Sequence, residues 1–390
     1  MECLQYLIHC IHSNINDIKQ IYLPTSIAVT ALYLPIFLLS IFNQKITKLS
    51  KWILTIPIVI YLLFIPIYQP IRSIPLFNSC IAGIAIYYVQ KVCEWLLIRR
   101  NEFHQWSFFD IQHELFYYRV YTQSVSIKKL DKKKKKEIFF TGPIQFNKHA
   151  QSLIDISCNI IKYYVLLDFV IYSLHEIFST DFYEKYYKKY LLVQIIINQL
   201  GGCVVYLFLM FNYEIVRHTL CLLFNRPLEL IPDLFNEPYR AISPIDFWSR
   251  WHQIFKNTWI ELIFKPISTL ICHHWPYLPK FISYGISSMC VFLVSGIMHE
   301  YTVYITLNKF SGDQIKFFLV QGFAVLIEST FKQQLPQFYI SKPIGFFLTF
   351  IFNGITAGYF IQPWIPFFCD KKILKYSFIN FAIRNLFYKY

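Results

Sequence analysis

Long apolar stretches constrain the fold of this chain more than any other feature. Eight of them approach or exceed the length of a helix that spans a membrane: residues 21–42, 52–68, 74–98, 154–178, 191–211, 281–307, 315–331 and 343–361. About 18 residues of α-helix cross the ~30 Å hydrocarbon core of a bilayer. Helices satisfy their own backbone hydrogen bonds in lipid. The sequence therefore predicts an all-α, polytopic transmembrane helical bundle of eight spans, with a possible ninth at 373–388.

The composition agrees with a membrane protein and argues against a soluble one. Charged residues make up 15% of the 390 residues and hydrophobic residues 55%, with a mean hydropathy of +0.40. Soluble domains carry about 25% charged residues. The net charge of +14 is not accompanied by a known nucleic-acid-binding motif. We expect the excess Lys and Arg to orient the helices and to contact anionic membrane lipids, with no nucleic-acid partner.

The charge pattern also suggests how the chain is organised. Five consecutive lysines, Lys132–Lys136, must lie in water, and the positive-inside rule places them in the cytosol. We expect one integral-membrane domain over 1–390, made of N-terminal spans (1–125), a basic cytosolic loop (126–150) and a helical core (151–390). The broken apolar stretch at 4–11 does not predict a cleavable signal peptide.

The cysteines and histidines do not predict a metal site. The ten cysteines include no CxxC pair, and His273-His274 has no further ligands at a suitable spacing. We therefore expect neither a disulfide framework nor a bound metal.

One histidine lies inside an apolar stretch. His299 and the adjacent Glu300 fall within 281–307, and the small residues Ser295 and Gly296 precede them. Ionisable groups at membrane depth are costly and usually functional, and small residues let another helix or a bound chain approach closely. A histidine that only packs against a neighbouring helix remains the alternative. Because Glu300 is rotated by ~100° from His299, we expect it to face a different partner.

A second cluster lies about fifty residues upstream, in Asp246-Phe247-Trp248-Ser249-Arg250-Trp251-His252. Ser243 is a plausible N-cap, followed by Pro244 at the first helical position and Asp246 in the first turn. We expect an amphipathic helix from Ser243 to about Phe264. Read on its own, this helix could simply be an aromatic and basic segment anchored among lipid headgroups.

Together these residues resemble a known family. The FWSRWH sequence at 247–252, followed by SGIMHEY at 295–301, is similar to the membrane-bound O-acyltransferases. SPIDFW at 243–248, the SGxxHE string and QGFAVLIE at 321–328 resemble the wax synthase-like branch of plants and fungi. That branch usually has two arginines between its tryptophans, whereas this chain has only Arg250. The shorter spacing is closer to the bacterial alginate O-acetyltransferases, which weakens the inference to a wax ester product.

The resemblance implies an enzyme of the endoplasmic reticulum that transfers a long-chain acyl group from acyl-CoA to the hydroxyl of a lipid-like alcohol. His299 would be the catalytic base. The residues agree independently, because an imidazole with an ordinary pKa near ~6.5 can accept an alcohol proton at cellular pH. A thioester is already activated, and a GxSxG motif for a covalent intermediate is absent from the sequence. Acyl-CoA is then a co-substrate, and no cofactor is expected.

The remaining candidate roles concern the substrates. His252 could polarise the thioester carbonyl as a second catalytic group. Arg250 could pair with CoA phosphates, and Trp248 and Trp251 could line the binding site of the donor. Ser295 and Glu300 complete the candidate substrate-binding set, with a purely structural role for Glu300 equally open.

Other acceptors and another class of function remain open. A sterol, a terpenoid, diacylglycerol or a glycan could replace the long-chain alcohol. A membrane transporter is the alternative of a different class, although the sequence lacks the matching halves that transporters often show.

Overall fold

The computed structural model describes residues 15–42, 51–68, 75–116, 146–224, 233–335, 340–369, 374 and 377–381. These residues form helices and connecting loops, without a β-strand among them. Five helical segments within them are long and apolar enough to cross a membrane: Asn78–Ile98, Leu191–Thr219, Lys280–Leu307, Asp313–Gln334 and Lys342–Cys369. The predicted all-α polytopic fold is confirmed.

All eight predicted apolar stretches lie in helices. They correspond to α2 (Ile15–Phe42), α3 (Lys51–Tyr68), α4 (Pro75–Cys93) with the π-helix η2 (Glu94–Ile98), α7 (Phe146–Ser179), α8 (Leu191–Phe224), α12 (Lys280–Leu307), α13 (Asp313–Gln334) and α14 (Lys342–Ile361). Most of the possible ninth span at 373–388 and of the basic loop at 126–150 lies outside the described residues.

The chain forms two compact units, and each is described by itself. The first combines Met1–Leu115 with Asn257–Leu326, and the second combines Phe116–Lys256 with Ile327–Tyr390. The three boundaries fall at the last residue of α6 (Phe108–Phe116), inside α10 (Gln253–Trp259) and inside α13. That the chain is one domain stays a prediction.

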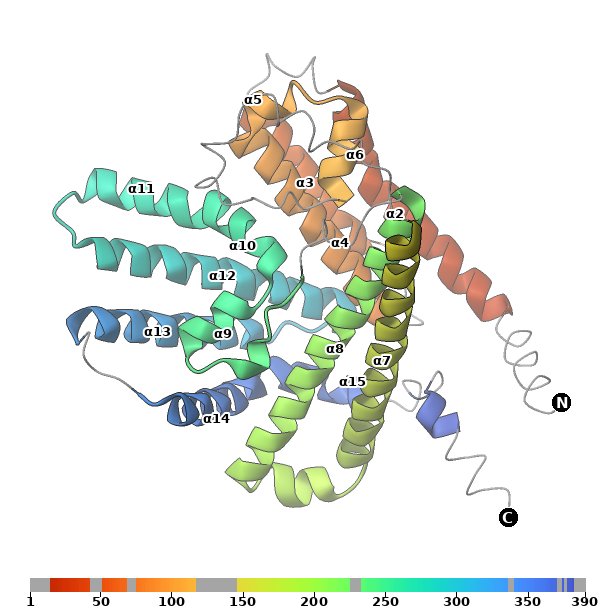
Figure 1. The fold of residues 1–390 in the computed structure, drawn as a ribbon, viewed down its shortest axis with the longest axis vertical. Helices are drawn as coiled ribbons and strands as arrows, with labels where there is room; N and C mark the ends of the chain where they lie inside the picture. Colours follow the sequence, from red (N-terminus) through yellow and green to blue (C-terminus); the bar gives the residue numbers. More distant parts are fainter. Residues whose placement is uncertain are drawn as a thin grey trace. The chain divides into compact units, whose positions relative to one another are not determined.

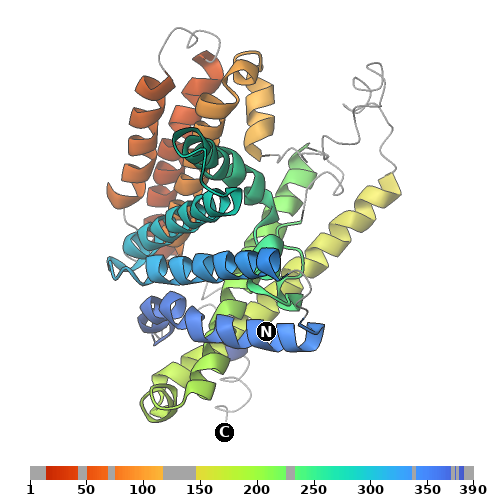
Figure 2. The same cartoon turned by 90° about the vertical axis from the view of Figure 1, so that its left-hand side faces the viewer.

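In the first unit, α2, α3 and α4 lie side by side, as Figure 2 shows. α4 also packs against α12, and α11 (Lys265–His274) runs alongside α12 (Figure 1). Two short helices, α5 (Arg100–Phe103) and α6 (Phe108–Phe116), follow η2. Their aromatic side chains complete the core, because Trp95 is fully buried and stacks on Phe103 with 5.7 Å between ring centroids.

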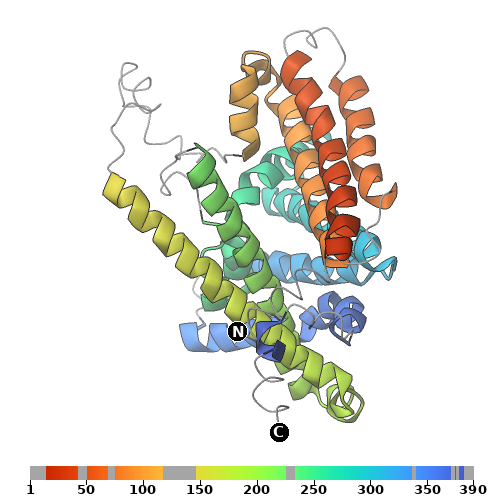
Figure 3. The same cartoon turned by 90° about the vertical axis from the view of Figure 1, so that its right-hand side faces the viewer.

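In the second unit, α7 and α8 pack against each other as a hairpin (Figure 3). The π-helix η4 (Tyr183–Tyr187) lies in the connection between them. α14 lies on α8, where the Asn198 side-chain amide donates to the Gly354 carbonyl at 2.8 Å. A ring nitrogen of His175 hydrogen bonds to the Phe368 carbonyl at 2.7 Å and so ties α15 (Ile365–Cys369) to α7.

Candidate active site

The aromatic and basic motif begins on a well-capped short helix, α9 (Pro244–Arg250). The Ser243 hydroxyl accepts the Asp246 amide hydrogen at 3.2 Å, and Pro244 occupies the first turn. Glu328 adds a second cap, because its carboxylate accepts the Ile245 amide hydrogen at 2.8 Å. The predicted N-cap is therefore confirmed. Glu328, at the end of the QGFAVLIE string, supports the motif helix directly.

The predicted continuous helix from Ser243 to Phe264 is wrong. α9 ends at Arg250, and α10 begins at Gln253, after His252 adopts a left-handed backbone with φ = 43°. Two backbone hydrogen bonds explain the break: the Gln253 amide donates to the Leu234 carbonyl at 2.8 Å, and the Arg250 carbonyl accepts from Asn236 at 2.9 Å. Left-handed non-glycine residues are uncommon and tend to occur at functional sites.

The break gathers an aromatic cluster. Phe235 packs on Trp251 with ring centroids 4.5 Å apart and on His252 at 5.3 Å. Phe247 stacks on Trp251 at 5.4 Å and contacts Trp248 edge-to-face at 5.3 Å. Three of the predicted site residues thus share one cluster with Phe235, which the sequence had not indicated. Only the fold brings Phe235, from the loop that precedes the motif, to these rings.

Arg250 is held by its own helix. Its Nε donates to the Asp246 carboxylate at 2.7 Å, and its Nη1 approaches the Asn236 carbonyl at 3.4 Å. The guanidinium is half-buried, and the ion pair is an i,i+4 contact. These contacts orient the side chain and give it a structural role. Its predicted pairing with CoA phosphates stays a prediction.

His299 lies on the face of α12 that contacts α13. Its imidazole stacks on Phe318 with ring centroids 4.7 Å apart and an interplanar angle of 23°. One turn earlier, a Cβ placed on Gly296 would come within 2.9 Å of the Ile315 Cα, so only glycine permits this approach of the two helices. Ser295 and His299 are both partly exposed. Gly296 therefore serves close helix packing at this point, one of the two roles expected for the small residues from the sequence.

Glu300 serves the start of the next helix. Its side chain is buried, and its carboxylate accepts the amide hydrogens of Ser311 and Gly312 at 2.8 Å and of Gln314 at 3.0 Å. An anionic cap is favourable at a helix N-terminus, where unpaired amides carry partial positive charge.

The expectation that Glu300 and His299 face different partners is wrong, since both contact α13. The carboxylate reaches the first turn of α13, while the imidazole lies on its second turn. Both side chains can contact α13 because its first two turns lie beside neighbouring residues of α12. The geometry favours the structural alternative for Glu300, and its role in substrate binding stays a prediction.

The predicted site residues thus form two groups. Trp248, Arg250, Trp251 and His252 belong to one compact unit, and Ser295, His299 and Glu300 belong to the other.

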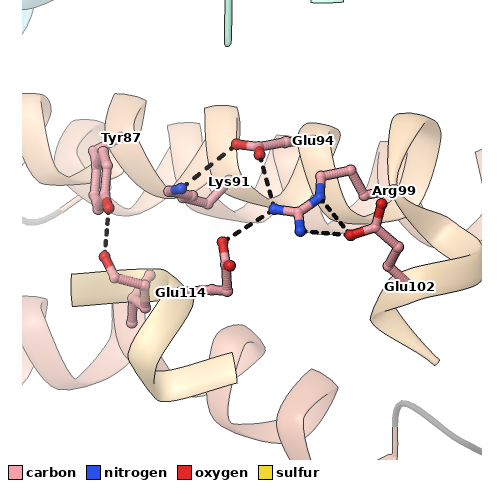
Figure 4. Close-up of polar contacts among 7 residues, drawn as sticks. Tyr87, Lys91, Glu94, Arg99, Glu102 and Glu114 are labelled. Carbon is pink, nitrogen blue, oxygen red and sulfur yellow. Dashed lines mark hydrogen bonds and ion pairs between the residues drawn. The ribbon is translucent and has the colours of Figure 1, made fainter. Parts of the chain in front are cut away.

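The structure adds a buried charge cluster that the sequence analysis missed. Figure 4 shows it around Arg99, which pairs with Glu114 at 3.1 Å, with Glu94 at 3.4 Å and with the exposed Glu102 at 2.6 Å. Lys91 contacts Glu94 at 3.5 Å. Lys91, Glu94, Arg99 and Glu114 are each buried and together carry no net charge. This balance lets the four ionisable groups be removed from water.

A sequence signal for this cluster exists. Lys91 and Glu94 fall inside the predicted stretch 74–98, where ionisable side chains are rare and usually partnered. The π-helix η2 starts at Glu94, and its widened turn is the type of local irregularity often seen at functional positions. The cluster is therefore centred on the end of the third predicted span and the short helices that follow it.

Comparison with known proteins supports the family resemblance seen in the sequence. Residues 231–320 match the membrane bound O-acyl transferase family. This segment is about a quarter of the chain. The matched segment includes both the aromatic and basic motif and His299. The match and the relatives named for long-chain-alcohol acyl transfer agree with the sequence resemblance to the wax synthase-like branch.

Curated relatives of the chain carry the names of O-acyltransferases. It is 30% identical over 140 residues to an acyl-CoA–sterol O-acyltransferase 1 of Arabidopsis thaliana, covering 35% of the chain and 39% of the relative. It is 28% identical over 139 residues to a long-chain-alcohol O-fatty-acyltransferase of Simmondsia chinensis, covering 35% and 38%. It is 26% identical over 163 residues to a probable long-chain-alcohol O-fatty-acyltransferase 7 of Arabidopsis thaliana, covering 41% and 46%. The chain spans less than half the length of these relatives.

Proposed function

We propose that this protein is an acyl-CoA-dependent O-acyltransferase that esterifies the hydroxyl of a lipid-like alcohol with a long-chain acyl group. One observation carries the proposal: the family match covers a segment that contains both the FWSRWH motif and His299. The names of the relatives, which specify long-chain alcohols or sterols as acceptors, support the same reaction class.

His299 is the general base in this proposal. The imidazole accepts the proton of the alcohol as the alcohol oxygen attacks the thioester carbonyl carbon. Collapse of the tetrahedral intermediate breaks the carbon–sulfur bond and gives the ester. The resulting imidazolium returns the proton to the departing thiolate, which leaves as free CoA. The reaction is balanced without a redox step, and no metal or prosthetic group takes part in it.

The packing of His299 is compatible with this role. Phe318 covers a face of the imidazole, whereas the two nitrogens of such a ring lie on its edge. Stacking fixes the ring plane without using the lone pair that accepts a proton. Apolar surroundings also limit hydrolysis of the thioester by keeping water away.

The aromatic cluster of α9 and the following turn is proposed to hold the donor. Trp248 and Trp251 provide flat apolar surfaces for the acyl-CoA arm, and His252 provides a hydrogen-bond donor for the thioester carbonyl. Arg250, already oriented by Asp246, would present its remaining N–H groups to phosphate oxygens.

A sterol acceptor is the second candidate, because one relative is named a sterol O-acyltransferase. A long-chain alcohol is preferred, since several other relatives that match are named for that acceptor. The proposed location is the endoplasmic reticulum membrane.

The test uses membranes from a host that lacks its own ester-forming enzymes. Labelled acyl-CoA is supplied with a panel of long-chain alcohols and sterols, and the labelled esters are separated. We expect His299→Ala to lower ester formation by about 10²- to 10⁴-fold at normal protein level, the range typical for loss of a general base.

His274→Ala is the matched control, because His274 is an exposed histidine at the end of α11. This variant should keep wild-type activity. Unchanged ester formation in His299→Ala would contradict the catalytic role, and transport of a solute without ester formation by the wild type would favour the transporter.

A further inference from the structure

One face of α8 carries three ionisable side chains that the proposed reaction does not yet use. Glu214, Arg217 and His218 have i, i+3 and i+4 spacing, which places them on the same side of the helix. They lie near the end of the candidate span Leu191–Thr219. The predicted stretch ended at 211, and for this reason the sequence did not draw attention to them.

Their hydrogen bonds are incomplete. Arg217 Nη1 donates to Glu214 Oε1 at 2.9 Å and lies 3.9 Å from the exposed Asp233 carboxylate. Three further polar atoms are buried without a hydrogen-bond partner among the described residues: Glu214 Oε2, Arg217 Nε and His218 Nδ1. The Glu214 residue is only 2% exposed. Native proteins rarely leave buried polar groups unsatisfied, because each loses its bonds to water without replacement.

The surroundings connect this face to the donor side of the proposed site. Tyr163, on α7, interacts electrostatically with Tyr206, on α8, and with Glu214 and Arg217. Tyr206 packs on Phe235 with ring centroids 5.1 Å apart. Phe235 in turn contacts the motif residues Trp251 and His252, all within the same compact unit.

The chemistry of the three atoms restricts the ligand. A carboxylate oxygen accepts a hydrogen bond, and Arg217 Nε donates one. A ligand that satisfies both atoms must both donate and accept a hydrogen bond. It must also be neutral, since the charges of Glu214 and Arg217 already cancel. Hydroxyl and amide groups meet these conditions, whereas phosphates and ammonium groups do not. The pantetheine arm of acyl-CoA carries two amides and one hydroxyl along a flexible chain.

We propose that the Glu214–Arg217–His218 face of α8 binds an amide or hydroxyl of the pantetheine arm of the acyl donor. This inference rests on the proposed function, because it assumes that acyl-CoA is the donor. Ring contacts from Tyr206 through Phe235 to Trp251 connect this part of α8 with the motif. Arg217 and His218 are thereby binding residues for the donor, distinct from the reacting groups.

The first experiment measures the KM for the donor in two variants. His218→Phe removes the Nδ1 atom while keeping an aromatic ring and the Glu214–Arg217 ion pair, and Glu214→Gln removes the carboxylate charge. Val216→Ala, on the exposed side of the same helix, is the matched control. We expect each of the first two variants to raise the KM for acyl-CoA by about tenfold, the effect of one hydrogen bond. S-acyl pantetheine keeps the arm but lacks the nucleotide. Its KM should rise by the same factor in these two variants.

The second experiment makes the inference independent of activity. Binding of pantetheine itself to the purified full chain in detergent micelles is measured by titration calorimetry. Binding to the wild type that weakens in His218→Phe supports the site, even if the wild type forms no ester and the proposed function fails. An unchanged donor KM together with unchanged pantetheine binding would overturn the inference. So would a rise in the KM for the alcohol alone, or a change confined to thermal stability, as expected if only a buried water occupies the face.

Discussion

At the scale of single residues, two carboxylates in the motif strings of the sequence, Glu300 and Glu328, prove to cap helices. Glu300 accepts three amide hydrogens at the start of α13, and Glu328 accepts one at the start of α9. An acid at membrane depth is stabilised by the partial positive charge of unpaired amides, without a cationic side chain. A polar residue beside the histidine that is proposed as the base therefore need not take part in the chemistry.

Replacement of Glu300 should lower the stability of the fold and leave the affinity for substrates unchanged. Glu300→Ala leaves three amides near a buried position without an acceptor, and hydrogen bonds to charged groups contribute about 1.5–3 kcal/mol each. We expect a loss of more than about 2 kcal/mol, with Glu300→Gln intermediate because one carbonyl oxygen remains. Thermal unfolding in detergent, followed by tryptophan fluorescence, measures the effect. Ester formation by the remaining folded protein should show unchanged KM values.

Glu184→Ala is the control, because Glu184 forms an exposed i,i+4 pair with Lys188. It should unfold at the wild-type temperature. If Glu300→Ala instead raised a KM while leaving the unfolding temperature unaltered, Glu300 would be a substrate-binding residue, and the cap would be incidental.

At the scale of elements, the sequence predicts which segments are helical but not where every helix ends. Apolar content alone locates the eight main helices, because lipid leaves the backbone few alternatives. The cap at Ser243 is local and was also predictable. The break at His252 was not, since it depends on hydrogen bonds to the backbone at Leu234 and Asn236. The extension of α8 to Phe224 was missed because ionisable side chains interrupt the apolar pattern there.

The contact between α12 and α13 gives a prediction at this scale. A methyl group at Gly296 would lie 2.9 Å from the Ile315 Cα, a backbone atom that cannot move without shifting α13. Gly296→Ala should therefore push the helices apart, at a cost of about 1–3 kcal/mol as for other overpacked sites. Because His299 stacks on Phe318 across this contact, ester formation should fall as well. Thermal unfolding in detergent and the labelled-ester assay measure the two effects.

Gly83→Ala is the matched control in the same compact unit. A Cβ at Gly83 meets no atom of the described residues within 4 Å, and alanine is the better helix former. This variant should be at least as stable as the wild type. Equal stability and activity of Gly296→Ala and Gly83→Ala would show that the helices have room to separate at His299.

At the scale of the whole molecule, each compact unit holds one half of the family motif. The FWSRWH residues belong to one unit, and His299 belongs to the other. The sequence could identify both halves, because each carries a recognisable string. It could not show Phe235 beside Trp251, or Glu300 at the start of α13, since these contacts arise only when separate segments pack.

Integration into the membrane provides the prediction at the largest scale. Ile355 lies at the centre of the candidate span Lys342–Cys369, and 46% of its surface is exposed. If lipid covers this side of α14, a charge there must be buried in hydrocarbon, at a cost of about 2.5–3.5 kcal/mol for lysine at a helix centre. Ile355→Lys should thus lower the amount of folded protein that accumulates in the membrane fraction. Ile355→Leu should behave as the wild type, and so should Tyr277→Lys, because Tyr277 is 98% exposed in the loop between α11 and α12. Wild-type accumulation of Ile355→Lys would mean that this face of α14 is covered by protein or water instead of lipid.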